Sequence, residues 1–384
     1  MRFPEFSGEW NKYTINDLAT VVGGGTPDTT VKSYWGGDIQ WFTPSEIGKN
    51  KYVDFSKRTI TRDGLDNSSA KLLPLHTILL SSRATVGECS IASNECTTNQ
   101  GFQSLIAKQC NIDFLYYLIQ TKKKDLIRNA CGSTFLEISA NEIRKIKVAV
   151  PVQNEQEQIA KLLSLIDERI ATQNKIIEDL KKLKSAISKQ AFAQKPNGWN
   201  RLDTLFSKGK AGGTPTSTNK EYYNGEIPFL SINDITKQGK YVRYTENHLS
   251  QSGLENSSAW MVPKYSLIMS MYASVGLVTI NEIPITTSQA MFAMQLKDKD
   301  LLDYLYYYLS YFKYRYIHKY LETGTQSNIN ADIVRGIMIP TYGHSRNMEI
   351  ASTLQGFDAK IDNELSVLEL FNRQKNYLLS QMFI

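Results

Sequence analysis

The sequence predicts a mixed α/β (α+β) protein in which one module is present twice in tandem. Each copy is followed by a long helix, and the two helices are expected to pair as an antiparallel coiled coil in a pseudo-twofold arrangement. Two observations predict this class. Short motifs recur in the same order at a nearly constant separation, and two long segments carry apolar residues at heptad spacing.

The repeat extends over the whole chain and sets its organisation. The separation between matching segments is 189 residues for Trp10-Asn11 and Trp199-Asn200, and it drifts only between 188 and 192 elsewhere. Chance does not produce so many collinear matches. The other matched segments are Gly24-Gly25-Thr26-Pro27 with Gly212-Gly213-Thr214-Pro215, 64–70 with 253–259, Ala84-Thr85-Val86-Gly87 with Ala273-Ser274-Val275-Gly276, 97–100 with 286–289, and 113–117 with 303–307.

Each module has the same expected order of elements. Short strands bounded by Gly, Pro, Asn and Asp come first, for example 39–42 and 77–82. An aromatic helix follows, then a short closing strand, then the long helix. The aromatic helices are expected at 114–123 and 301–316, with most of their tyrosines in the core, and the closing strands at 146–150 and 337–340.

The two long helices share one apolar seam, shifted by 191 residues. The seam needs a partner, and the obvious partner is the other copy, although each helix packing on its own module is the alternative. Asn154 and Ser345 are expected to cap the helices. The seam residues are Ile159, Leu163, Ile166, Ile170, Ile177, Leu180, Ile187 and Ala191, and Ile350, Leu354, Phe357, Ile361, Leu368, Phe371, Leu378 and Met382.

Polar residues interrupt both seams at matching positions. They are Gln173 and Lys184 in the first helix, and Glu364 and Lys375 in the second. Polar residues on such a seam usually fix the register between paired helices. The second interpretation is that they form a polar edge that faces another subunit. The expected domains are residues 1–150 (first module), 151–195 (central helix), 196–341 (second module) and 342–384 (distal helix).

Composition limits the possible functions. Of 384 residues, 41% are hydrophobic and 21% charged, which predicts two or three packed domains and argues against disorder. The net charge of +6 permits a polyanionic partner but is small for a protein that coats nucleic acid without sequence preference. The four cysteines form no C-x-x-C pair, so we expect reduced thiols. Without a signal region or an apolar span, a soluble, cytoplasmic protein is expected.

The motifs of several enzyme classes are missing from the sequence. It contains no phosphate-binding loop with lysine, no Asn-Pro-Pro-aromatic motif of amino-methylation, and no closely spaced metal ligands. The Gly23–Pro27 turn could approach a phosphate, but plain turn geometry is the simpler interpretation. The four histidines are scattered and do not match between the repeats. A duplicated chain without a duplicated acid, base or ligand set indicates a binding protein with no metal site.

The candidate binding residues are polar and lie in repeated loops. Arg83 could bind guanine or a phosphate, and Tyr272 replaces it in the second copy, as two different specificities would require. The alternative for Arg83 is an ordinary surface arginine. For Lys123 and Lys313, in the basic part of the aromatic helices, the alternative is a solvated helix face. The residues expected to contact the ligand are Thr26, Lys49, Arg83, Thr85, Lys123, Ser133 and Thr134 in the first module, and Thr214, Asn233, Tyr272, Ser274, Lys313, Thr325 and Gln326 in the second.

The chain resembles the specificity subunits of type I restriction–modification systems. The features that carry the resemblance are Arg2-Phe3-Pro4-Glu5-Phe6 with Trp10, the two Gly-Gly-Thr-Pro turns, and the loops Gly132-Ser133-Thr134 and Gly324-Thr325-Gln326. The series Pro151, Glu155-Gln156 and Gln158-Ile159-Ala160 completes them. Each motif is short, and their order and duplication are specific. The Glu-Gln pair is not retained near Met348-Glu349, where the second copy departs from the pattern.

The resemblance implies a non-catalytic DNA-reading subunit. Each module would be a target recognition domain that reads one half of a bipartite, interrupted sequence in double-stranded DNA. The helices would set the spacing and dock two methyltransferase subunits, and restriction/translocase subunits would join the complex. S-adenosylmethionine, ATP and magnesium would be bound by those partners, and this chain would bind no cofactor. The alternatives are a self-contained nuclease or methyltransferase with an unrecognised site, and an assembly protein that uses the helices as a spacer.

Overall fold

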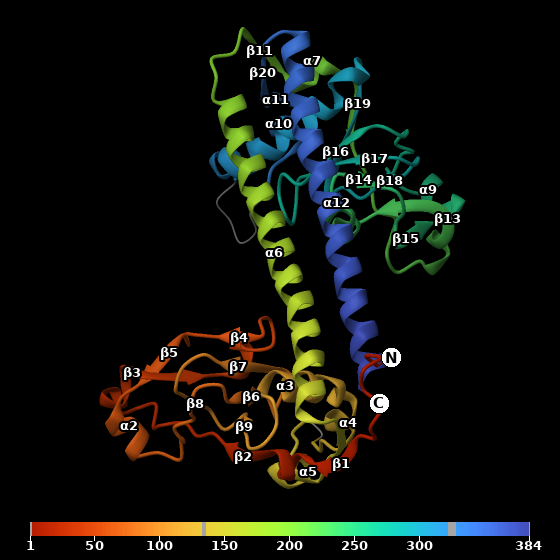
Figure 1. Ribbon diagram of the computed structural model, residues 1–384. Helices are drawn as coiled ribbons and strands as arrows, with labels where there is room; N and C mark the ends of the chain where they lie inside the picture. The colour runs from red at the N-terminus through yellow and green to blue at the C-terminus, as the bar shows by residue number, and fades with distance from the viewer. Residues whose placement is uncertain (1, 133–135, 322–327, 384) are drawn as a thin grey trace. The chain divides into compact units, whose positions relative to one another are not determined.

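The computed structural model describes residues 2–132, 136–321 and 328–383 (Figure 1). The chain forms two compact units, Met1–Lys175 with Leu365–Ile384, and Ile176–Glu364. Each unit contains one module together with about half of each long helix. The helices α6 (Gln153–Phe192) and α12 (His344–Met382) are therefore shared between the units.

The first module contains a larger and a smaller mixed sheet. The larger has the order β2 (Ala19–Gly23), β9 (Gln103–Ala107), β6 (Ile78–Leu80), β7 (Cys89–Ala92), β4 (Tyr52–Val53). The smaller has the order β5 (Arg58–Ile60), β3 (Trp35–Phe42), β8 (Cys96–Thr98), and β1 (Asn11–Thr14) pairs with β10 (Lys147–Val150). The β4–β7 and β3–β8 pairs are parallel and the others antiparallel.

The second module repeats this topology strand for strand. The larger sheet has the order β12 (Phe206–Ala211), β19 (Met291–Leu296), β16 (Leu267–Ser270), β17 (Val278–Asn281), β14 (Tyr241–Val242). The smaller has the order β15 (Asn247–Leu249), β13 (Tyr223–Leu230), β18 (Thr286–Thr287), and β11 (Gly198–Arg201) pairs with β20 (Met338–Thr341). The duplication and the mixed α/β class are thus confirmed.

Short helices complete both modules. In the first they are α1 (Ile15–Leu18), η1 (Lys32–Tyr34), η2 (Pro44–Glu46), α2 (Arg62–Asp66), α3 (Ile112–Thr121), α4 (Lys123–Arg128) and α5 (Ala140–Lys145). In the second they are α7 (Leu202–Leu205), η3 (Lys220–Tyr222), α8 (Ile232–Gln238), α9 (Gln251–Glu255), η4 (Lys299–Leu301), α10 (Leu302–Arg315), η5 (Ile317–Lys319) and α11 (Ala331–Gly336). Helix α3 begins before the expected residue because the side chain of Asn111 accepts a hydrogen bond from Phe114 N at 2.9 Å.

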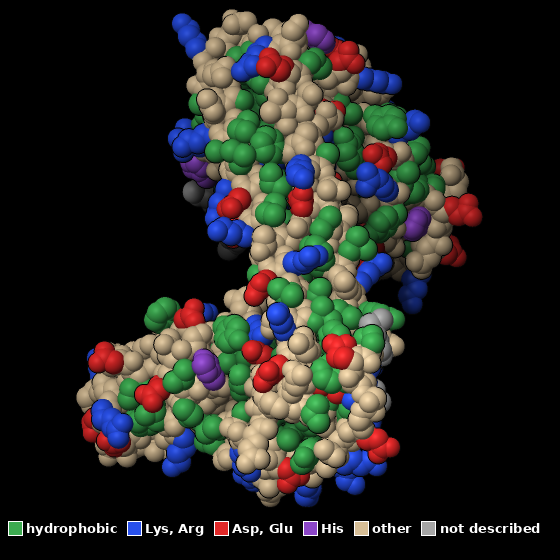
Figure 2. Space-filling model, in the orientation of Figure 1, with side chains coloured by type: hydrophobic (Ala, Val, Ile, Leu, Met, Phe, Trp, Pro, Cys, Tyr) green, Lys and Arg blue, Asp and Glu red, His purple; other side chains and the backbone are tan. Residues whose placement is uncertain are grey.

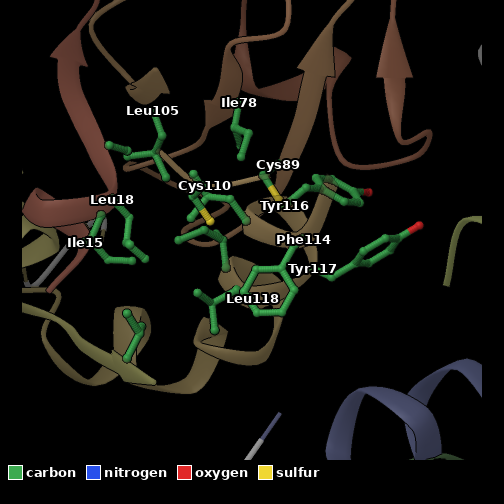
Figure 3. Packing of buried hydrophobic residues seen from close by; sticks show 14 of the residues in the cluster. Ile15, Leu18, Ile78, Cys89, Leu105, Cys110, Phe114, Tyr116, Tyr117 and Leu118 are labelled. Atoms are coloured by element: carbon green, nitrogen blue, oxygen red, sulfur yellow. The ribbon is translucent and has the colours of Figure 1, made fainter. Parts of the chain in front are cut away.

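The aromatic helices pack into the cores, as expected. Tyr116 and Tyr117 of α3 are buried beside Phe114, and Figure 3 shows them among side chains from the larger sheet and α1. In the second unit Tyr304, Tyr307 and Tyr308 of α10 occupy the corresponding core. All four cysteines are free, and Cys131 is exposed whereas the other three are buried.

The long helices contact each other within each unit. In the first unit Leu378 and Met382 near the end of α12 join the core that contains Ile159 and Leu163 near the start of α6. In the second unit the order is reversed, and Ile350 near the start of α12 joins Ala191 near the end of α6. This reversal defines an antiparallel pair. Among the described residues every predicted seam position, polar ones included, is buried or half-buried.

The expected helix caps were wrong by two residues. The carbonyl of Val152 accepts from Gln156 N at 3.1 Å, and that of Gly343 accepts from Asn347 N at 3.0 Å. These carbonyls open the two helices, so Asn154 and Ser345 lie inside the first turns. The preceding strands fix these starting points because β10 ends at Val150 and β20 at Thr341.

An ion pair at the start of α6 joins two of the sequence motifs. The guanidinium of Arg2 contacts both carboxylate oxygens of Glu155 at 2.6 Å, and Trp10 Nε1 donates to the same carboxylate at 3.3 Å. Glu155 is fully buried. The neighbouring Gln156 accepts from Asn111 N at 3.0 Å. The N-terminal motif and the Glu-Gln pair therefore form one anchoring contact.

Replacing Arg2 with alanine is expected to lower the melting temperature of the chain, because it leaves the buried carboxylate of Glu155 without its guanidinium. The matched control is Arg62→Ala, which removes an arginine from an exposed ion pair with Asp66 at 3.3 Å. Such surface pairs contribute little. Differential scanning calorimetry of both variants checks the prediction, and equal melting temperatures would contradict it.

Among the described residues, the structure contains no helix with the length and apolarity that a membrane span requires.

Candidate nucleic-acid interface

The Gly-Gly-Thr-Pro turns are packing turns. A Cβ on Gly24 would lie 2.0 Å from the carbonyl oxygen of Asn99, and one on Gly25 would lie 2.3 Å from Ala70 N. In the second module a Cβ on Gly212 would lie 1.9 Å from Thr287 O. Three of the repeated segments therefore meet at one crowded point in each module. This geometry supports the plain-turn interpretation, since protein backbone already occupies the space beside the glycines.

Hydrogen bonds connect this turn to the loop that carries Arg83. The hydroxyl of Thr26 hydrogen-bonds Gln100 Oε1. Ser82 N then donates to Gly101 O at 2.8 Å. On the other side, Ile138 N donates to Ser82 O at 2.9 Å. We call Thr26, Gln100, residues 82–87 and residues 136–138 the first loop edge.

The second module has the same loop edge. The hydroxyl of Thr214 hydrogen-bonds Gln289 Oε1. Met271 N donates to Ala290 O at 2.7 Å, and Ile329 N donates to Met271 O at 3.0 Å. The second loop edge is therefore Thr214, Gln289, residues 271–276 and residues 328–329. The structure thus brings together the predicted residues Thr26, Arg83 and Thr85, and likewise Thr214, Tyr272 and Ser274.

Both loops are held in a strained backbone conformation. Ala84 has a φ of 64°, and Ala273 and Ser274 have φ values of 44° and 47°. Non-glycine residues in this region cost about 1 kcal/mol or more and cluster at functional sites. A buried serine supports each loop, because Ser81 Oγ donates to Arg83 O at 3.1 Å and Ser270 Oγ donates to Ser274 O at 2.7 Å. The loop shape is therefore built into the duplicated frame.

The exposed side chains on these loops differ. Arg83 lies 3.8 Å from Glu137, with 47% of its side chain exposed, so it remains available to a ligand. Tyr272 at the matching position is 41% exposed. Thr85 and Ser274 are also exposed. One frame thus presents a cationic group in one copy and an aromatic hydroxyl in the other.

The predicted basic residues beside the loops have different environments. Lys123 forms an ion pair with Glu88 and lines a cleft of about 920 Å³ together with Lys49. Lys313 packs beside Gly276 as Lys123 packs beside Gly87. Leu277 takes the position of Glu88, so Lys313 has no carboxylate partner among the described residues. Burial lowers the pKa of Lys313.

The remaining predicted residues lie elsewhere or outside the described part of the chain. Asn233 lies in α8, where its side chain donates to Glu246 at 2.9 Å. Ser133 and Thr134 lie outside the described residues, and so do Thr325 and Gln326. The segment that leads into the first pair is anchored, because Cys131 and Glu137 exchange two backbone hydrogen bonds of 2.9 Å.

One candidate was missed by the sequence reasoning. The guanidinium of Arg58 stacks 3.6 Å from the ring centre of Trp35, and Trp35 contacts Trp41 edge to face at 5.0 Å. Both indole N–H groups bind the glycine-rich turn, because Trp35 donates to Asp28 O and Trp41 to Gly25 O. Arg58 is exposed and has no carboxylate partner among the described residues. Stacking therefore presents an unpaired cation on the two tryptophans that bind the glycine-rich turn.

The feature that would have identified Arg58 as a candidate is the register between β3 and β5. Trp41 of β3 pairs directly with Arg58 of β5, and a shift between Trp35 and Ile39 also brings Trp35 over the arginine. The sequence alone does not give this register. In the second module Asn247 pairs with Phe229, so no cation stands there.

Charge is dispersed over the face of the molecule drawn in Figure 2. The face in Figure 2 shows lysine and arginine side chains interspersed with acidic ones, in keeping with the small net charge. Within the residues that the structure describes, no group of three or more His, Cys, Asp or Glu side chains could hold a metal ion.

The two modules share one topology, differ in the exposed side chains of their loop edges, and are connected by two long helices. This combination defines a class of binding protein with two related recognition modules in one chain. The chain belongs to the family of type I restriction modification DNA specificity domains, which matches residues 7–182 and 196–369. The family match occurs twice, once for each module with its adjoining helix.

Known relatives carry the same assignment. The chain is 33% identical over 257 residues to the type I restriction enzyme MjaIX specificity subunit of Methanocaldococcus jannaschii, covering 60% of this chain and 59% of that protein. It is 28% identical over 175 residues to the EcoR124I/EcoR124II specificity subunit of Escherichia coli, covering 44% and 43%. The chain thus matches about six-tenths of the length of the first relative and less than half of the second.

Two solved structures share the fold over the whole chain. The S subunit of a type I restriction-modification system from M. genitalium has a TM-score of 0.58 at 16% identity and covers 100% of this chain and 99% of its own. A chain from a type I R-M system studied for complex assembly and conformational transition has a TM-score of 0.64 at 15% identity, with 98% of both chains covered. At these identities the likeness shows the fold alone.

Proposed function

We propose that the chain is the DNA-recognition subunit of a type I restriction–modification complex, in which each module reads one half of a bipartite, interrupted target. The observation that carries the proposal is the pair of loop edges. Their backbone frames match, whereas their exposed side chains differ at Arg83 and Tyr272. A second difference lies on the neighbouring strands, where Arg58 of β5 is replaced by Asn247 of β15. Direct readout of bases requires this division between a fixed frame and variable side chains.

Different residues suit different contacts with DNA. Arg58 and Arg83 suit bidentate binding of guanine, because both are exposed guanidinium groups held by neighbouring residues. Lys49, Lys123 and Lys313 suit phosphate contacts. The hydroxyls of Thr26, Thr85, Thr214 and Ser274 suit base edges or phosphate. The polar side chains of Ser133, Thr134, Thr325 and Gln326, which lie outside the described residues, suit the same contacts.

The proposed partners follow from the family. Two methyltransferase subunits would dock on the paired helices, and restriction/translocase subunits would join them. The reactions would then occur on those chains, with S-adenosylmethionine, ATP and magnesium bound there. The names of the relatives support a place in a multi-subunit restriction enzyme, since they are specificity subunits of type I restriction enzymes.

An exchange of the first module tests the proposal. Residues 11–150 are replaced with those of a relative that has a known target, which retains Arg2, Trp10 and Glu155 as one anchor. Methylome sequencing of the host is expected to show one altered half-site, with the other half-site and the gap unchanged. Changes in both half-sites, or in neither, would contradict the assignment of one module to one half-site.

A second assay addresses the rival interpretation as a self-contained enzyme. The purified chain is incubated alone with DNA and magnesium, and separately with S-adenosylmethionine. The proposal expects no cleavage and no methyl transfer until the partner subunits are added. Turnover by the chain alone would rule out a purely recognising role.

Replacing Arg58 with alanine in the assembled complex is expected to weaken specific binding by ~1–3 kcal/mol, the usual range for a side chain that reads a base. The loss should depend on one base pair of one half-site. Titration of duplexes that carry single substitutions checks this, with Arg62→Ala as the control on the same module. A uniform loss on all sequences with a weaker salt dependence would assign Arg58 to a phosphate instead.

A further inference from the structure

The same polar cluster occurs in both units, at the place where each module meets the long helices. In the first unit Lys51 Nζ lies 2.7 Å from Asp113 Oδ1, and Tyr52 OH donates to the same oxygen at 2.8 Å. In the second unit Lys240 lies 2.6 Å from Asp303, and Tyr241 OH donates to Asp303 at 3.3 Å. The aspartates lie in the first turns of α3 and α10, so each lysine links the strand region to the aromatic helix.

The cluster continues from the aromatic helix to both long helices. Tyr117 OH donates to Asp167 of α6 at 2.7 Å, and Lys375 of α12 lies 2.7 Å from the same aspartate. The second unit repeats this with the helices exchanged. Tyr307 OH donates to Asp358 of α12 at 2.6 Å, and Lys184 of α6 forms an ion pair with Asp358.

Direct contacts close the connection between the two halves of each cluster. Lys51 Nζ donates to Ser164 Oγ of α6 at 2.6 Å and lies 4.9 Å from the centre of the Tyr117 ring. In the second unit Lys240 Nζ donates to Tyr307 OH at 3.0 Å. An unbroken series of polar contacts therefore runs from the module through α3 or α10 to both helices.

These groups are too enclosed to be ordinary surface pairs. The side chains of Lys51 and Lys240 are 9% and 11% exposed, and that of Lys375 is 18% exposed. Burial and then Asp167 raise the pKa of Tyr117 well above its ordinary range. Placing charges in such surroundings has a desolvation cost that only specific geometry offsets. Each cluster therefore favours one orientation of the module on the helices.

The clusters also account for the polar seam residues. Lys184 and Lys375 lie on the seam and each reaches an aspartate of the opposite helix within its own unit. This favours the register interpretation of these lysines over an edge that faces another subunit. In the first unit the aspartate follows Ile166 directly, so the cluster lies close to the end of the module's apolar contact with α6.

We propose that the two clusters are joints that fix the angle of each module on the helical pair and thereby set the separation at which two half-sites are read. The inference rests on the proposed function. Lys51, Tyr117, Asp167 and Lys375, and their second-unit counterparts Lys240, Tyr307, Asp358 and Lys184, are positioning residues. They hold the reading loops in place without touching DNA.

The first test measures the joint without DNA. Spin labels are attached to cysteines replacing Leu75 in the module and Lys175 on α6, in a chain with Cys131→Ser. Both labelled positions are exposed and belong to the first unit. Asp167→Asn is expected to broaden the label-to-label distance distribution, and Glu168→Gln, which removes the neighbouring exposed carboxylate, should leave it unchanged. Tyr117→Phe, which removes one oxygen from a core ring, should broaden it also.

The second test measures the consequence in the assembled complex. Methylation is compared on duplexes with the native gap between half-sites and on duplexes one base pair longer or shorter. Asp167→Asn is expected to reduce the preference for the native gap about tenfold, the effect of losing one hydrogen bond to a charged group. The half-site sequences should stay the same. Tyr117→Phe should act in the same direction.

The outcomes separate the joint from the proposed function. An unchanged distance distribution and gap preference, in variants that melt like Glu168→Gln, would overturn the joint. A wild-type complex without any bipartite preference would contradict the proposed function. The joint would then be judged by the label distances alone, and distances that are the same in wild type and variants would overturn it. Altered half-site bases in Asp167→Asn would assign the cluster to DNA reading and overturn its positioning role.

Discussion

Replacing Gly24 with alanine is expected to destabilise the first unit strongly, whereas Gly23→Ala should be tolerated. The new methyl group at Gly24 would lie 2.0 Å from the carbonyl oxygen of Asn99, and backbone there has no room to move aside. At Gly23 the nearest atom, from the side chain of Gln103, would be 3.6 Å away, which is ordinary contact. Overpacking a well-packed site costs ~1–3 kcal/mol, and a backbone clash lies at the upper end.

Thermal unfolding of the two adjacent variants measures this difference directly. Gly212→Ala should reproduce the effect in the second unit, because its methyl group would lie 1.9 Å from Thr287 O. Equal melting temperatures for Gly23→Ala and Gly24→Ala would refute the assignment of the motif to packing. A loss of DNA binding by Gly24→Ala at unchanged stability would instead indicate that the turn approaches a phosphate.

The fold could be predicted because its determinants are periodic or repeated. The seam fixed which faces of α6 and α12 are buried, down to Lys184 and Lys375. The collinear motifs predicted that two modules share one topology, which the matching strand orders confirm. The helix starts were missed because they depend on where β10 and β20 end, a tertiary constraint that no capping residue records.

The candidate site could be predicted only in part, for a related reason. The loop of Arg83 was found because it is a repeated motif with one differing side chain. Arg58 was missed because its stacking on Trp35 depends on strand register. The joints were missed because their members are distant in sequence and meet only after the helices pair. The repeats in the sequence reveal the shared backbone frame of the two modules, whereas contacts between residues distant in sequence are seen only in the three-dimensional structure.

The ion pairs of the two joints are the same contact with the two helices exchanged, so the joints lie at equivalent places along the helical pair. Asp167 pairs with Lys375 and Asp358 pairs with Lys184, so the same contact forms in both directions along the antiparallel helices. The positions midway between these ion pairs are Lys175–Ile176 in α6 and Ser366–Val367 in α12. An insertion at both positions leaves each joint intact, because all the joint residues of one unit lie on the same side of the insertion points.

Inserting one heptad at both midpoints, close to Glu178, is expected to lengthen the unspecified gap of the DNA target. Seven residues keep the seam in phase and extend the helical pair by about 10 Å at ~1.5 Å per residue. That length corresponds to at most about three base pairs at ~3.4 Å each. Both half-sites should stay unchanged, because every residue of both loop edges and both joints is retained.

The control is the same heptad inserted in α6 alone. It leaves seven residues of α6 without partners on α12 and should lower the melting temperature, whereas the paired insertion should not. Methylome sequencing of cells with the paired insertion reads half-sites and gap together. A longer gap with the original half-sites would establish that the helices act as a spacer of defined length. An unchanged gap in a stable complex would show that the length of the helical pair does not set the spacing. Altered half-sites would show that the helices contribute to base reading and do not act as a spacer alone.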